Sequence, residues 1–194
     1  MIATLRRTSL AVLGIACTLA ATATAATAAT GEPETLHVDG TQTLASENLY
    51  KSHGGLLGDF WILTFVPLYE SDSLVIGTGT ERFEGCVDVN LDENCEEPEP
   101  SGELQFDYVQ WATFDPSTGE LIEGNCVHPI TGGSGSFQGA RGLVTMHDVV
   151  VKGEVETTYQ GTVVLNAVPA DPTEAPAQTA HAFAAVAPAS RGHC

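Results

Sequence analysis

The stretch LQFDYVQWATF, residues 104–114, alternates between two kinds of side chain along its whole length. Every second residue belongs to one face of the predicted strand, made of Leu104, Phe106, Tyr108, Gln110, Ala112 and Phe114. Apart from Gln110 that face is apolar, whereas the opposite face carries Gln105, Asp107 and Thr113 and is more polar. A repeat of two indicates a β-strand with one face toward a core.

Similar short runs extend to both sides, without any long helical period. The predicted strands are 36–44, 60–69, 74–83, 104–114, 121–129, 143–151 and 155–166, with an eighth near 47–52. Turn residues separate them: DPSTG at 115–119 combines a proline with a glycine that accepts positive φ, and Lys152–Gly153 favours a tight hairpin. This spacing predicts an all-β sandwich or small antiparallel barrel.

The two ends of the chain differ in composition from this middle part. Residues 1–30 begin with a basic segment, continue with a short apolar run from Leu10 to Leu19, and end in small residues, which is typical of a cleavable signal peptide. The apolar run is too short to span a bilayer, which takes about 20 residues. Residues 31–166 form the predicted β-domain, and the Ala- and Pro-rich segment 167–194 is predicted to be a disordered tail. We therefore expect a secreted, extracellular protein.

The chain is strongly acidic. Without Arg6 and Arg7 of the leader, 5 of the 7 Lys and Arg residues remain against 25 Asp and Glu, a formal charge of −20. Such a surface repels phosphate groups, so we expect neither nucleic-acid binding nor docking on anionic membranes.

Four cysteines follow the leader. Their proximity favours a disulfide between Cys86 and Cys95, which would close a short acidic loop. Cys126 could then pair with Cys194 or remain a buried thiol, and the residues alone leave both pairings open.

The acidic loop CVDVNLDENCEEPE, residues 86–99, has oxygen-bearing side chains at alternate positions. They are Asp88, Asn90, Asp92, Asn94 and Glu96, and Glu99 stands eleven residues after Asp88. This spacing is that of a calcium-binding loop, although Glu93 occupies the position that normally needs glycine. A calcium site and a solvated acidic hairpin tip stay open as interpretations, and no organic cofactor is predicted.

A glycine-rich motif, ITGGSGSFQGARG at 130–142, continues into LVTMHD, and TYQGTV lies in the last predicted strand. This pattern resembles the signature of the allene oxide cyclase and dirigent-like barrel superfamily, especially its secreted bacterial members. The resemblance implies an eight-stranded antiparallel barrel with a hydrophobic cavity, often self-associating as a homo-oligomer. It also implies that small apolar molecules are held in a reactive shape, mainly by proximity and orientation.

Three functions follow as candidates. In the first, the barrel binds a small hydrophobic ligand, with Phe106, Tyr108, Met146 and Tyr159 as wall residues by strand parity. In the second, a cyclase or isomerase acts on a lipid or polyketide-like substrate, and Arg141 at the barrel mouth orients a ligand oxygen. The third is an extracellular interaction module stabilised by calcium. Whether the protein is an enzyme is left open by the sequence.

Overall fold

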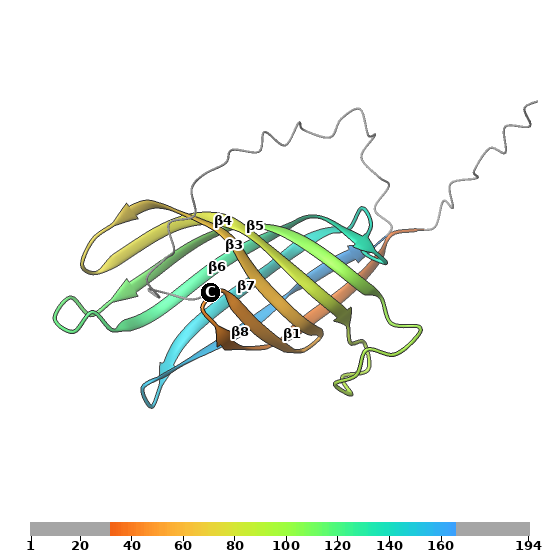
Figure 1. Cartoon of the computed structure of the whole chain (residues 1–194), viewed down its shortest axis with the longest axis horizontal. Helices are drawn as coiled ribbons and strands as arrows, with labels where there is room; N and C mark the ends of the chain where they lie inside the picture. The colour runs from red at the N-terminus through yellow and green to blue at the C-terminus, as the bar shows by residue number, and fades with distance from the viewer. Residues whose placement is uncertain (1–31, 166–194) are drawn as a thin grey trace, which may run out of the picture. The chain divides into compact units, whose positions relative to one another are not determined.

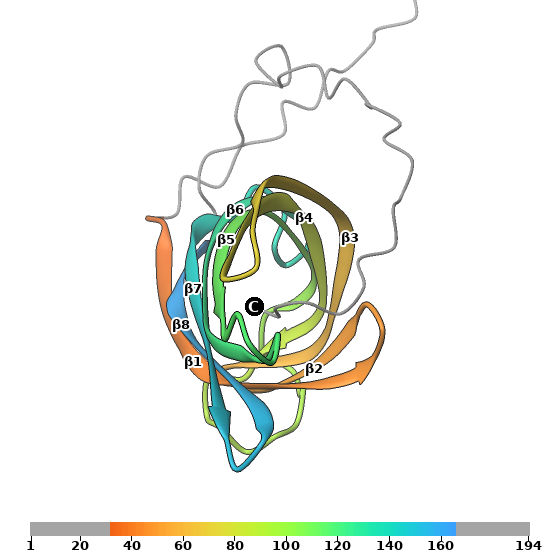
Figure 2. The same ribbon diagram turned by 90° about the vertical axis from the view of Figure 1, so that its left-hand side faces the viewer.

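The computed structural model describes residues 32–165, which form a closed barrel of eight antiparallel strands (Figures 1 and 2). The strands are β1 (Glu34–Ser46), β2 (Leu49–Gly54), β3 (Leu56–Glu70), β4 (Leu74–Val87), β5 (Ser101–Phe114), β6 (Leu121–Gly135), β7 (Arg141–Val151) and β8 (Glu154–Leu165). Each pairs with the next along the chain, and β1 closes the barrel by pairing with β8. The all-β class and the barrel are confirmed. The predicted leader and tail lie outside the described residues.

Short turns explain why neighbours in sequence are neighbours in the barrel. The β7–β8 hairpin turns at Lys152 and Gly153, both with positive φ (55° and 88°), as the sequence indicates. Before β6, the side chain of Asp115 accepts the Ser117 N–H at 2.7 Å, and Gly119 takes a φ of 73°. The tight turns therefore set the antiparallel order locally.

The alternation along β5 places its apolar face inside the barrel. All six residues of that face, Gln110 included, are at most 6 % exposed. The interior contains one large apolar cluster, which includes Phe60, Phe83 and Phe106, and a smaller cluster built on Val75, Ala112 and Phe114. The large cluster contains inward side chains from all eight strands, so the barrel interior is lined mainly by apolar residues.

The glycine-rich motif differs in part from its expected shape. A run rich in glycine favours a sharp turn, but β6 continues through Gly132 and Gly133 to Gly135. The turn comes after it, where Gly135 and Gly139 have φ values of 64° and 74°. Phe137, in the turn between β6 and β7, is completely buried in the large apolar cluster, so its ring anchors this turn to the core.

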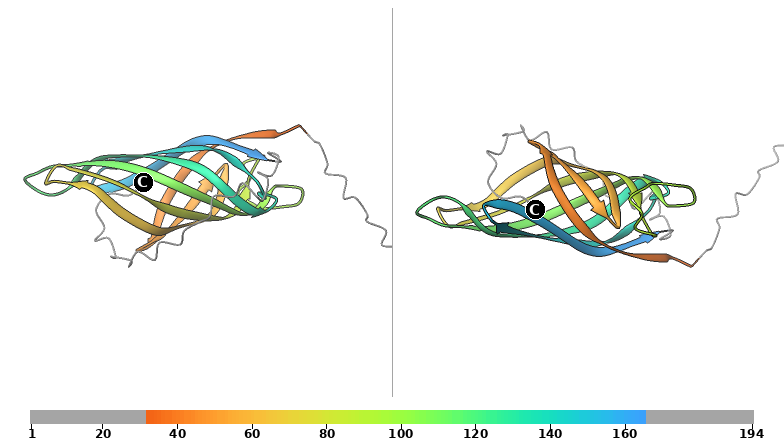
Figure 3. Two further views of the ribbon diagram at one scale, coloured as in Figure 1. Left: turned by 90° about the horizontal axis from the view of Figure 1, so that it is seen from above. Right: turned by 90° about the horizontal axis from the view of Figure 1, so that it is seen from below.

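The two ends of the barrel carry different loops. The β4–β5 connection, which contains the acidic loop, lies at one end, and the β3–β4 and β5–β6 turns lie at the other (Figures 1 and 3). The predicted disulfide between Cys86 and Cys95 is confirmed and joins the end of β4 to this loop. Within residues 32–165 there is no helix long and apolar enough to cross a membrane.

Candidate functional site in the barrel interior

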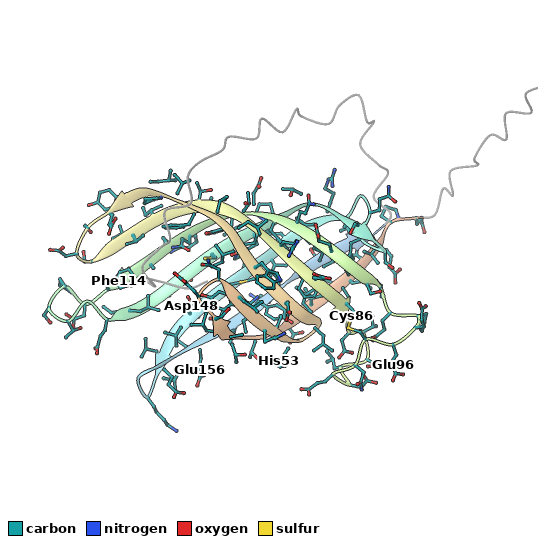
Figure 4. The ribbon with its side chains drawn as sticks, in the orientation of Figure 1. His53, Cys86, Glu96, Phe114, Asp148 and Glu156 are labelled. Atoms are coloured by element: carbon teal, nitrogen blue, oxygen red, sulfur yellow. A yellow bond between two sulfur atoms is a disulfide. The ribbon has the colours of Figure 1, made fainter. Side chains whose placement is uncertain are left out.

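Several polar side chains project into the barrel beside the apolar core. Those that are at most 5 % exposed there are Gln42, Ser52, Glu81, Gln110, His128, Asp148 and Thr157. They come from seven different strands, one residue from each strand except β3, so only closure of the barrel brings them together. Figure 4 shows Asp148 between Phe114 toward one end of the barrel and Cys86 toward the other. Burying so many polar groups is costly unless each finds a partner.

His128 and Glu81 form the centre of this group. His128 Nε2 lies 3.2 Å from Glu81 Oε2, and their side chains are 0 % and 3 % exposed. The two atoms are within ion-pair distance, but their alignment does not make a hydrogen bond, and both lack a hydrogen-bond partner among the described residues. His128 Nδ1 is unpartnered in the same way. Such atoms call for a water molecule or a ligand group beside them.

Aromatic rings enclose the His128 imidazole. The Tyr108 ring stacks on it with centroids 5.6 Å apart, and Phe106 meets it edge-on at 6.3 Å. The Tyr108 hydroxyl donates to the carbonyl of Thr64 at 3.1 Å, which fixes the ring that covers the imidazole. His128 is thus held in an apolar, low-dielectric position in which electrostatic interactions are strong.

Asp148 is the second buried carboxyl group of the site. Its Oδ1 accepts a hydrogen bond of 2.6 Å from the Thr157 hydroxyl, whereas Oδ2 has no partner among the described residues. Burial raises the pKa of Asp148 to about 7, although the Thr157 hydrogen bond and the nearby His128 act in the opposite direction. A carboxyl group with this pKa can both give and take a proton near neutral pH.

Two tyrosines lie within the electrostatic reach of these carboxylates. The pKa of Tyr50 is raised, first by burial and then by Asp148 and Glu81. The pKa of Tyr108 is raised by burial and by Glu81. Both phenols therefore stay protonated, and the site combines neutral phenols with two carboxyl groups and one imidazole.

All four predicted wall residues project into the barrel. Phe106, Tyr108, Met146 and Tyr159 are between 1 % and 3 % exposed. The Tyr159 hydroxyl is fully engaged with backbone, because it accepts from Leu56 N–H at 2.7 Å and donates to the His53 carbonyl at 2.8 Å. It ties β8 to the β2–β3 turn, and burial raises its pKa. Contact of these four residues with a ligand stays a prediction.

Arg141 lies at the start of β7 and is exposed. Its Nη1 donates to the carbonyls of Ala140 at 2.8 Å and Thr131 at 3.0 Å. These bonds hold the guanidinium against the backbone of the β6–β7 turn. The structure therefore brings Arg141 near this turn and not into the cluster of Glu81, His128 and Asp148.

The acidic loop is organised by its own carboxylates. Asp88 is 1 % exposed, and its two oxygens accept the N–H groups of Asp92 and Glu93 at 3.3 and 2.8 Å. Glu99 accepts the Val89 N–H at 2.9 Å. The other predicted ligands, Asn90, Asp92, Asn94 and Glu96, are exposed.

Glu93, at the position where a calcium loop has glycine, has a φ of 62°. Within residues 32–165, no three His, Cys, Asp or Glu side chains are arranged to hold a metal ion. Calcium binding by this loop stays a prediction.

Sequence reasoning recognised only part of the interior site. The alternation of the strands puts His128 on the same face as Cys126, and Asp148 on the face opposite His147, as the structure has them. None of the motifs in the sequence gives Glu81 a role. The signal for Glu81 is the parity of β4, where Val75, Gly77, Gly79, Glu81 and Phe83 occupy successive inward positions. Its pairing with His128 depends on strands that are not adjacent in the barrel, and no local pattern gives that.

Comparisons with known proteins add no further assignment. No protein-family model matches the chain, and neither the curated proteins nor the solved structures give a match. The resemblance to allene oxide cyclase and dirigent-like barrels therefore remains a prediction from the motif. The buried polar groups of the interior site are the features that bear on function.

Proposed function

We propose that this protein is a secreted binding protein that holds a small, largely apolar molecule inside its barrel. The polar group of that molecule would sit against Glu81, His128 and Asp148, and its apolar part against the surrounding aromatic and aliphatic side chains. One observation carries the proposal: buried polar atoms of all three residues lack hydrogen-bond partners within residues 32–165. Ligand sites typically combine an apolar lining with a few such convergent polar groups.

The charges of the site favour a ligand that donates hydrogen bonds. Two of its three central groups are carboxyls, and the buried side chains of the site include neither Lys nor Arg. A hydroxyl, phenol or amine would satisfy the free oxygens of Glu81 and Asp148, whereas an anionic headgroup would be repelled. A charge-assisted hydrogen bond of this kind contributes about 1.5–3 kcal/mol.

The first experiment is native mass spectrometry of the mature protein taken from culture supernatant. A co-purifying organic mass would support the binding function and identify the compound. In parallel, the neutral fluorescent probe N-phenyl-1-naphthylamine, which has one N–H donor, should bind with increased emission. The absence of both a native adduct and probe binding would refute the proposal.

Matched variants distinguish binding of the probe inside the barrel from binding on its outer surface. Glu81→Gln combined with Asp148→Asn should weaken probe binding about tenfold, the equivalent of one lost charge-assisted hydrogen bond. Glu123→Gln is the control, because Glu123 is an exposed carboxylate on the outside of β6. Equal weakening by both changes would place the probe outside the barrel.

A second candidate function is proton-transfer isomerisation or cyclisation of the bound molecule. The pKa of about 7 for Asp148 favours it, because a general acid–base group works best with a pKa near the working pH. If the compound identified by mass spectrometry is a substrate, incubation should change its chromatographic retention without changing its mass. Asp148→Asn should abolish the conversion, and binding without conversion would leave the first function alone.

A further inference from the structure

The outer face of the barrel has a groove lined mainly by residues that point away from the interior site. It has a volume of about 750 Å³ and runs over β5, β6, β7, β8 and β1. Figure 2 shows these strands following one another around one side of the barrel. Most of the residues that line the groove alternate in sequence with those of the interior, so the same strands present a second surface outside. The buried residues Cys126, Met146 and Tyr159 also border it.

The strand register arranges the lining in two parallel rows. The first crosses the five strands through directly paired residues, Trp111, Asn125, His147, Thr158 and Thr41. The second, across the last four strands, contains Val127, Thr145, Gln160 and Asp39. Because neighbouring strands lie about 4.8 Å apart, the first row extends over about 19 Å. The length of the groove therefore suits an elongated ligand.

The first row begins with one aromatic ring, and most of the other side chains in the two rows are uncharged groups that form hydrogen bonds. Trp111 is 40 % exposed, so part of its indole is open to solvent. Amide, hydroxyl and imidazole groups follow it along the row, and each can donate or accept. Among the described residues that line the groove there is no Lys or Arg, and Asp39 is the one carboxylate.

The middle of the first row is fixed in place. Asn125 Oδ1 lies 3.1 Å from His147 Nδ1, and Asn125 Nδ2 donates to Glu123 at 3.2 Å. Glu123 Oε1 also lies 3.7 Å from His147 Nδ1, so this nitrogen faces two oxygens of β6. These groups sit on a closed sheet, which positions side chains more rigidly than a loop does.

We propose that this groove binds a neutral oligosaccharide. The apolar C–H face of a sugar ring would stack on the Trp111 indole, and hydroxyls of the following rings would bond to the amide, imidazole and hydroxyl groups of the two rows. The formal charge of −18 and the lack of a cation in the lining exclude acidic or sulfated chains as the favoured ligand. The predominance of polar side chains disfavours an apolar partner surface.

The test is affinity electrophoresis in native gels that contain soluble neutral polysaccharides: a dextran, a β-glucan, a galactomannan and an arabinoxylan. At least one should retard the protein, and Trp111→Ala should weaken that binding tenfold or more. Trp61→Ala is the matched control, because Trp61 is the other of the two tryptophans and lies on β3, outside the groove. In that control, Trp111 is the remaining tryptophan, so its emission should change as the polysaccharide binds.

Three results would overturn the inference: no retardation by any of the neutral polymers, equal loss in Trp111→Ala and Trp61→Ala, or equally strong retardation by heparin. A second variant, Gln160→Ala, should weaken binding by removing an amide of the second row. The circular dichroism spectrum and melting temperature of Trp111→Ala check that the barrel is intact, independently of any ligand in its interior. The interior and groove proposals can thus fail separately.

Discussion

At the scale of single residues, the orientation of a side chain decides its chemistry. Asp148 and His147 are neighbours in sequence, yet Asp148 is 0 % exposed inside the barrel and the His147 side chain is 44 % exposed outside. The same carboxyl group on the outer surface would titrate like any acidic side chain. Inside, loss of hydration disfavours the charged form, which is the main cause of its raised pKa.

Asp148 should therefore make the stability of the protein depend on pH. Its pKa is about 7 in the folded protein and about 3.9 in an unfolded chain, so the unfolded state binds fewer protons between these values. The free energy of unfolding should then fall as pH rises from about 4 to 7, by on the order of 2–4 kcal/mol from this group.

The measurement is urea unfolding of the natural protein and of Asp148→Asn between pH 4.5 and 8. An amide keeps an oxygen for the Thr157 hydroxyl but does not ionise, so the stability of the variant relative to the natural protein should increase with pH. A difference that does not change with pH would contradict the raised pKa. Taking the difference cancels the titration of the other acidic side chains.

At the scale of elements, the β6–β7 turn depends on one ring. Phe137 is 0 % exposed, and its N–H and carbonyl both take part in turn hydrogen bonds, to Ser134 at 3.1 Å and from Ala140 at 2.9 Å. A Cβ on Gly133 would come within 2.4 Å of the Glu103 carbonyl oxygen on β5 and within 2.8 Å of the Phe137 Cβ, which explains why glycine stands there. Gly133 thus makes room for the neighbouring strand and for the Phe137 anchor, whereas Gly135 and Gly139 form the turn with their positive φ values.

Phe137→Ala should lower the free energy of unfolding by about 3–5 kcal/mol, because a fully buried aromatic ring leaves a cavity. The measurement is chemical denaturation followed by circular dichroism. Ser136→Ala is the control, since Ser136 is exposed in the same turn and should change the stability by less than about 0.5 kcal/mol. A small effect of Phe137→Ala would mean that the turn is held by its hydrogen bonds.

The acidic loop is the second element whose behaviour can be predicted. If it binds calcium, millimolar CaCl₂ should raise the melting temperature, and Asp92→Ala should remove the rise. Asp88→Asn should lower the melting temperature even in EDTA, because the buried Asp88 carboxylate accepts two backbone N–H groups. An equal rise in the natural protein and Asp92→Ala would place the ion elsewhere.

At the scale of the whole molecule, charge is the dominant property. With a formal charge of −18 on 194 residues, the acidic side chains of the folded protein repel one another, which lowers its stability. Added salt screens this repulsion, since the Debye length falls from about 30 Å at 0.01 M to about 3 Å at 1 M.

The melting temperature should therefore rise by several degrees between about 0.02 and 0.5 M NaCl. The experiment is thermal unfolding by circular dichroism in EDTA, so that divalent ions bound to the acidic loop do not contribute. KCl should have the same effect as NaCl, because screening depends on ionic strength and not on the cation. A flat or falling melting temperature would show that the charges are already well separated on the barrel surface.

The sequence alone determined the strands, their inward faces and the disulfide between Cys86 and Cys95. These features depend on local chemistry: a repeat of two, turn residues with allowed φ values, and two cysteines close in the chain. Closure of β1 on β8, the approach of Glu81 to His128 and the rows of the outer groove were decided only by the tertiary structure. They join residues far apart in sequence, and their positions depend on register across several strands, which no single segment encodes.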